Sequence, residues 1–158
     1  MDVEHTFAEL IKNMIKFITQ RSEIGAGTRG SSLGPDAIKL AAVNANSKLF
    51  INYENIDLSN QNYHLYLPTA TENALRIGVM EEVWKEHAQN VKDVSVSNNM
   101  PVVISGDHAS AGATIAGLKM AYPKSRLGVI WIDAHADLHS PYTSPSGNVH
   151  GMPLCASI

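Results

Sequence analysis

The sequence predicts an α/β fold with a mostly parallel sheet that helices cover on both faces. Two short apolar runs, 101–105 and 127–132, have the length and composition of buried strands. The segment between them, 109–121, is rich in small and apolar residues and is typical of a helix. A strand, a helix and a second strand with continuous apolar runs indicate a parallel sheet whose two faces are both buried.

The earlier part of the chain continues this alternation in weaker form. The expected elements are a strand near 14–19, a helix over 36–44, a strand within 50–58 and a long helix over 70–95. Pro35 suits the first turn of the helix that follows it. In 70–95, apolar side chains recur at steps of three and four residues, which core packing explains most simply.

A glycine-rich loop, 25–35, resembles a phosphate-binding loop at first sight. Nucleotide binding is disfavoured, because the glycines do not directly follow the strand near 14–19 and no GK[ST] sequence occurs. The loop therefore has no assigned role at the level of the sequence.

Composition and charge exclude several classes of function. The chain has 158 residues, about one domain, and a net charge of −3 without a basic run, which argues against a nucleic-acid surface. The sequence has no apolar stretch of the length that a membrane span needs, and residues 1–14 lack the apolar centre of a secretory signal. One cysteine, Cys155, cannot form an intramolecular disulfide, so we expect a cytoplasmic protein.

Polar clusters follow both apolar runs of the second half, where parallel sheets bind their ligands. Asp133, His135 and Asp137 come directly after the run 127–132 and would share one face if the backbone stays extended. Such crowded carboxylates favour a divalent cation, and the mixed carboxylate and imidazole set suits Mn²⁺, Zn²⁺ or Fe²⁺ better than Ca²⁺. The alternative is a hydrogen-bonded polar turn.

The other cluster, Asp107-His108, follows the run 101–105. His108 is a fourth candidate ligand, whereas we expect Asp107 to orient a ligand or to cap the next helix. The loop 138–153, here called the site loop, is dense in hydroxyl and amide groups. It could bind a small polar substrate, and an ordinary surface loop is the alternative.

Three stretches closely resemble motifs of the arginase family, within the wider ureohydrolases. They keep that family's order and spacing, and they are Ser105 to His108, Trp131 to Asp137 and Ser144 to Pro153. The first two are common to ureohydrolases, and the third favours arginase over agmatinase. The likeness is strong over about 101–154 and looser before that.

The resemblance implies a three-layer α/β/α sandwich and a pair of Mn²⁺ ions. It implies that Asp133 bridges both ions, that His108 and Asp137 hold one ion, and that His135 holds the other. It also implies substrate contacts from Ser144, Ser146 and Asn148, and proton transfer by His150, for which an imidazole is suited at neutral pH. The implied catalytic residues are thus His150 and Asp137, and the implied reaction is hydrolysis of L-arginine to L-ornithine and urea.

Two departures from the family pattern limit this expectation. His139 stands where the family usually has an asparagine that helps to bind the substrate carboxylate. Ureohydrolases are also about twice as long, so 1–158 is expected to be the N-terminal portion of one arginase-like domain, inactive by itself. Another ureohydrolase, acting on formiminoglutamate or another guanidino acid, and a truncated non-catalytic protein are the alternatives. A trimer or hexamer is expected for the longer form.

Overall fold

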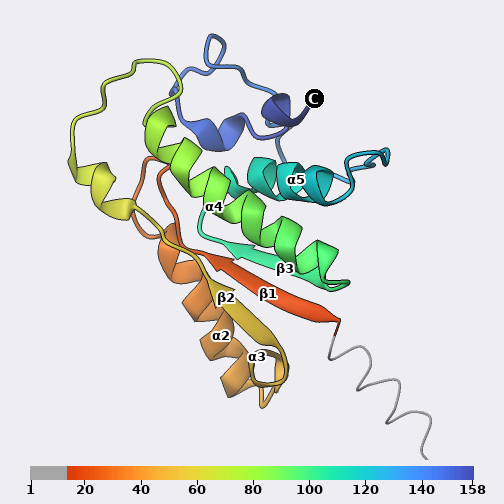
Figure 1. Ribbon diagram of the computed structural model, residues 1–158. Helices are drawn as coiled ribbons and strands as arrows, with labels where there is room; N and C mark the ends of the chain where they lie inside the picture. Colours follow the sequence, from red (N-terminus) through yellow and green to blue (C-terminus); the bar gives the residue numbers. More distant parts are fainter. Residues whose placement is uncertain (1–13) are drawn as a thin grey trace, which may run out of the picture.

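Three parallel strands form the sheet of the computed structural model, which describes residues 14–158 (Figure 1). The expectation that residues 1–14 lack a secretory signal concerns a segment of which 1–13 lie outside the described residues. The strands are β1 (Ile15–Gln20), β2 (Glu54–Asp57) and β3 (Met100–Ser105), in the order β2-β1-β3. Central β1 pairs with both neighbours, so that Phe17 lies opposite Asn55 on one side and Val102 on the other.

Helices lie on both sides of this sheet. They are α2 (Gly34–Asn44), α3 (Leu49–Asn52), α4 (Ile77–Val96) and α5 (Ser110–Ala121), with 3-10 turns at Ser31–Leu33, Asn62–Tyr66, Val149–Gly151 and Cys155–Ser157. The chain moves one way from β1 to β2 and back across β1 to β3. Right-handed crossovers in opposite directions place their helices on opposite faces. Figure 1 shows α2 below the sheet and α4 with α5 above it, which confirms the predicted parallel α/β class.

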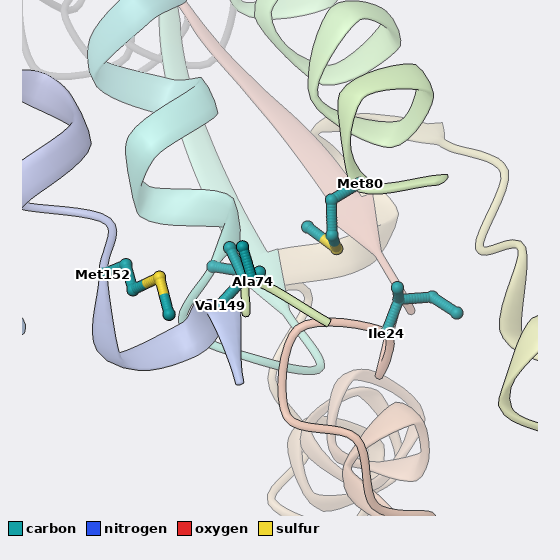
Figure 2. Packing of buried hydrophobic residues seen from close by; sticks show 6 residues of the cluster. Ile24, Ala74, Met80, Val149 and Met152 are labelled. Carbon is teal, nitrogen blue, oxygen red and sulfur yellow. The ribbon is translucent and has the colours of Figure 1, made fainter. Parts of the chain in front are cut away.

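Two clusters of buried side chains make up the core of the described residues. One cluster lies between β1 and α4 and consists of Ile18, Leu58, Val91 and Val94. The other lies at the carboxyl edge of the sheet and contains Ile24, Ala74, Met80, Ala109, Val149 and Met152 (Figure 2). This second cluster draws on the loop after β1, the approach to α4, the start of α5 and the site loop. The hydrophobic effect therefore holds these separate loops together at one edge.

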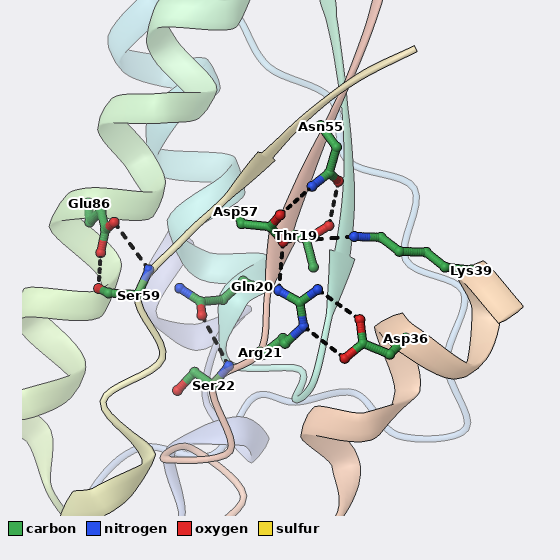
Figure 3. A network of polar contacts seen from close by, with 10 residues as sticks. All are labelled: Thr19, Gln20, Arg21, Ser22, Asp36, Lys39, Asn55, Asp57, Ser59 and Glu86. Atoms are coloured by element: carbon green, nitrogen blue, oxygen red, sulfur yellow. Dashed lines mark hydrogen bonds and ion pairs between the residues drawn. The ribbon is translucent and has the colours of Figure 1, made fainter. Parts of the chain in front are cut away.

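A network of charged side chains fixes the end of β1 (Figure 3). The Arg21 guanidinium donates to Asp57 Oδ1 at 2.6 Å, and to Asp36 Oδ1 and Oδ2 at 2.8 and 3.2 Å. Hydrogen bonds from Arg21 lower the pKa of Asp36. This one side chain joins the start of the glycine-rich loop to α2 and to β2, so the loop leaves the sheet in a defined direction.

Two expected elements of the first half are shorter in the structure. The expected strand 50–58 is limited to β2, because Leu49–Asn52 forms a helical turn that places the Phe50 ring 4.9 Å from that of Phe17. The expected helix 70–95 begins only at Ile77. Arg76 has a left-handed backbone (φ 58°), which does not continue a helix, and the Leu75 N–H bonds to the Gly147 carbonyl at 2.8 Å instead. The strand near 14–19 and the helix over 36–44 are confirmed, and Pro35 lies in the first turn.

The expected strand 127–132 is wrong for this structure. The segment pairs with no strand among the described residues, and Ile130 and Ile132 are 89% and 93% exposed. A cleft of about 490 Å³, lined by Val103 and Val129 among others, lies between this segment and β3. Apolar composition alone does not form a strand, because the backbone N–H and C=O groups need a neighbour within hydrogen-bonding distance. No helix of the described part is long and apolar enough to cross a membrane.

A buried histidine between α4 and α5 is expected to make stability depend on pH. His87 is fully buried, its Nε2 lies 2.9 Å from Thr114 Oγ1, and burial lowers its pKa from 6.5 to about 4. Between these two values the unfolded chain binds a proton that the folded chain excludes. Stability is therefore lost as the pH falls from about 6.5 to 4, by up to about 3 kcal/mol from this group.

Urea denaturation at several pH values in this window measures the effect. The His87→Leu variant should lose less stability on acidification than the wild type. The variant leaves no polar atom stranded, because the Thr114 hydroxyl also donates to the Ser110 carbonyl at 3.0 Å. Parallel stability–pH curves for the two proteins would contradict the assignment.

Candidate metal centre and substrate loop

All nine residues that the sequence analysis assigned to a site line one open cleft of about 740 Å³. The cleft lies at the carboxyl edge of the sheet, where parallel strands release their loops. The lining residues come from the segment after β3, from residues 133–137 and from the site loop. The lining includes His108, Asp133, His135, Asp137, His139, Ser144, Ser146, Asn148 and His150.

Three of the expected metal ligands face one another in this cleft. His108 Nδ1 lies 3.1 Å from Asp133 Oδ2 and 2.7 Å from Asp137 Oδ2. One donor atom from each of the three residues lies within 4.8 Å of the others. Two ligand atoms about 2.1 Å from a shared ion stand at most about 4.2 Å apart, so small movements would let this set close around one divalent cation. The donors, two carboxylates and one imidazole, fit Mn²⁺, Fe²⁺ or Zn²⁺.

The expected extended backbone over 133–137 is not what brings these groups together. Asp133 Oδ1 accepts the His135 N–H at 2.8 Å, which bends the chain, and Asp137 has a left-handed φ of 48°. The His135 N–H bond also lowers the pKa of Asp133. A left-handed non-glycine residue is uncommon and costs energy, so the local chain is held in place by its surroundings. The polar turn and the ligand cluster, posed as alternatives, occur together here.

His135 stands apart from the other expected ligands. Its side chain is 84% exposed at the rim of the cleft, and its Nδ1 lies 3.5 Å from Asp133 Oδ1. It is not part of the three-residue group. Its assignment to a second metal ion stays a prediction.

Two neighbours of His108 fix its place. The ring stacks on Trp131, with centroids 4.7 Å apart and an interplanar angle of 23°. The preceding Asp107 is buried, and its carboxylate accepts the N–H groups of Ala109, Gly25 and Ala26 at 3.0, 2.8 and 3.2 Å. Burial nevertheless raises the pKa of Asp107. The expected role of Asp107 at the start of a helix fits its bond to Ala109. The sequence analysis missed Trp131, although its position two residues before Asp133 was a usable signal.

The site loop is shaped by hydrogen bonds of its own. Ser144 Oγ accepts the Gly147 N–H at 3.0 Å, and Ser146 Oγ accepts the Asn148 N–H at 3.2 Å. His139 Nδ1 lies 3.3 Å from Thr143 Oγ1. Since the Ser144 and Ser146 hydroxyls act here as acceptors, their own protons are free to be donated. The loop therefore brings two hydroxyl donors to the cleft that the carboxylates also line.

Comparison with known proteins links this arrangement to one family. The sequence profile of the arginase family matches residues 16–158. An arginase of Brevibacillus brevis is 41% identical over 140 residues, which are 86% of this chain and 45% of that protein. An arginase of Bacillus caldovelox is 35% identical over 150 residues, which cover 91% of this chain and 48% of that protein.

Solved structures give the same result. The crystal structure of arginase from Bacillus subtilis matches with a TM-score of 0.68 and 34% identity, covering 90% of this chain and 45% of that one. The structure of Entamoeba histolytica arginase in complex with L-ornithine matches with a TM-score of 0.74 and 31% identity, covering 90% and 48%. The chain thus spans about half the length of the relatives it matches.

Replacing Asp137 by asparagine is expected to weaken Mn²⁺ binding by at least about tenfold, since even outer partners of metal ligands are worth that much. The change keeps the shape of the side chain and removes one of the two carboxylate charges that face His108. Bound Mn²⁺ can be counted from the loss of the free-ion signal in electron paramagnetic resonance. Asp93→Asn makes the same change on the exposed side of α4 and should bind as the wild type does. Equal affinities for Asp137→Asn and wild type would remove Asp137 from the ligand set.

Proposed function

Because the chain belongs to the arginase family, we propose that it supplies one half of a two-metal site that hydrolyses L-arginine to L-ornithine and urea. The observation that supports this most is the cleft in which His108, Asp133 and Asp137 meet and which Ser144 and Ser146 of the site loop also line. Family membership alone supports a hydrolase of the ureohydrolase type. The cleft adds a place where a cationic, guanidinium-bearing substrate would meet carboxylates and metal ions.

In this proposal, His108, Asp133 and Asp137 would hold one Mn²⁺ ion, and Asp133 and His135 would contribute to holding a second. Bound Mn²⁺ would make water a nucleophile at neutral pH and would offset negative charge as the guanidinium carbon is attacked. The His108 ring cannot turn freely, because it is stacked on Trp131. This stacking restricts the orientation of one proposed ligand, His108, without any bound ion.

The proposed substrate contacts come from the site loop. Ser144 and Ser146 donate their free hydroxyl protons to the α-carboxylate of arginine, and the Asn148 amide adds a further donor. His139 contributes from the same side of the cleft. His150 lies at the exposed rim and carries a proton between the site and bulk water, a task for which an imidazole is suited.

His139 favours a second candidate function. A histidine in place of an asparagine changes the group that meets the substrate carboxylate, so a formimino or another guanidino acid is the alternative substrate. Comparing turnover of L-arginine with that of such acids separates the two. The exposed His135 favours a third candidate, a non-catalytic protein that binds one ion. Assembly into a trimer or hexamer and residence in the cytoplasm stay expectations.

Ser146→Ala or Asn148→Ala is expected to weaken L-arginine binding by about 1–3 kcal/mol each, the cost of losing a hydrogen bond to a charged group. The measurement is the Michaelis constant in a form of the protein with a complete site. Ser140→Ala is the matched control, because Ser140 belongs to the same loop but does not line the cleft. If both variants kept the wild-type constant, neither residue would contact the carboxylate.

The 158-residue chain alone is expected to be inactive and to bind Mn²⁺ weakly. Four ligands with two carboxylate charges face the four positive charges of two Mn²⁺ ions, and Mn²⁺ is the weakest binder of the first-row divalent series. We propose that further acidic ligands come from residues outside this chain. Calorimetric titration with Mn²⁺, together with an assay for urea, tests this. Two tight sites per chain, or release of urea, would contradict it.

A further inference from the structure

The glycine-rich loop has no part in the chemistry proposed above, yet it lies against the residues that do. Gly25, Gly27 and Gly30 have the G-x-G-x-x-G spacing of a dinucleotide loop. In such a loop the glycines open a helix directly after a strand. Here α2 begins only at Gly34, after a separate 3-10 turn at Ser31–Leu33. The spacing of the glycines therefore needs another explanation.

The start of the loop is held by hydrogen bonds to the Asp107 carboxylate. One carboxylate oxygen, Oδ2, accepts the N–H groups of both Gly25 and Ala26, although the partners are 82 and 81 residues apart in sequence. Gly25 also lies so close to the start of α5 that a Cβ atom built on it would stand 2.5 Å from Ala109 Cβ. The loop can take this position only because residue 25 has no side chain.

The same loop also contacts the site loop, through Gly25 and Gly27. The Gly25 carbonyl accepts the His150 N–H at 3.1 Å. Gly27 has a φ of 70°, and a Cβ atom built on it would stand 2.7 Å from the side-chain oxygen of Asn148. Between these two contacts, Val149 is 1% exposed and belongs to the cluster that also contains Ile24 (Figure 2).

We propose that residues Gly25–Gly27 form a positioning element that sets where Asn148 and His150 stand relative to the metal ligands. Asp107 anchors this element, and Gly27 leaves the room that the Asn148 amide occupies. Asp107 precedes the ligand His108, so a short path of contacts joins the metal side of the cleft to its substrate side. The roles of Asn148 and His150 rest on the proposed function, whereas their placement by the loop does not.

Replacing Gly27 by alanine tests the contact between Gly27 and Asn148. Gly27→Ala and Gly30→Ala both place a side chain at a positive φ, 70° and 121°, but only at residue 27 does a Cβ atom meet another group. In two-dimensional NMR of the uniformly ¹⁵N-labelled chain, Gly27→Ala should shift the Asn148 side-chain amide signals, which Asn148→Ser identifies by their loss. Gly30→Ala should leave these signals in place. An unmoved Asn148 signal in Gly27→Ala, or equal shifts in both variants, would overturn the role of Gly27.

Replacing Asp107 by alanine tests the anchor. A methyl group accepts no hydrogen bond, so Gly25, Ala26 and Ala109 all lose their acceptor. Hydrogen exchange at the His150 amide should quicken by at least about tenfold, since its bond to Gly25 depends on the anchored loop. Amides in β1 and β3 report whether the fold persists. Wild-type exchange at His150 in a folded Asp107→Ala variant would refute the anchor.

Neither experiment needs metal or substrate. A chain that fails to hydrolyse arginine can still show both NMR effects, and an active chain can show neither. Failure of the positioning proposal is therefore distinct from failure of the proposed function.

Discussion

Parallel pairing of β1 with both of its neighbours forces the chain to leave β1 and β3 at the same edge of the sheet. The glycine-rich loop and the Asp107-His108 turn are thereby brought together from positions about 80 residues apart in sequence. Apolar side chains then close the arrangement, because Ile24, Ala109 and Val149 share one buried cluster (Figure 2). The cleft lies beside this cluster. The polar residues Asn148 and His150, which flank the buried Val149 in sequence, line the cleft.

The cleft concentrates groups that are costly to place together. Asp133 and Asp137 both direct an oxygen towards His108, and the Asp137 side chain is only 10% exposed. Removing such charges from water is unfavourable unless a counter-charge compensates them. The left-handed backbone of Asp137 adds strain at the same place. Local cost of this kind is typical of a site selected for binding rather than for stability.

The sequence was sufficient for features that depend on local pattern. The strands β1 and β3 and the helices α2 and α5 follow from apolar runs and breakers. The metal-ligand candidates follow from the polar clusters after two apolar runs, and the remaining cleft residues from the likeness to family motifs. Features that depend on distant partners were missed. The helix α4 starts later than expected, because Arg76 has a left-handed backbone and the Leu75 N–H bonds to the Gly147 carbonyl. Segment 127–132 is apolar enough for a strand but pairs with no strand in the described part of the chain, residues 14–158. The sequence assigned no role to the glycine-rich loop, because its role is proposed from contacts with Asp107 and Asn148, which are distant in sequence.

The segment 127–132, which pairs with no strand among residues 14–158, has a consequence for the behaviour of the chain in solution. Its sequence, Leu-Gly-Val-Ile-Trp-Ile, is uncharged and rich in residues that favour cross-β stacking. Because Ile130 and Ile132 are exposed to water, this six-residue segment can pair with the same segment of another copy of the chain. Stretches of this kind promote association between copies of a chain, so the 158-residue chain by itself is expected to aggregate as its concentration rises.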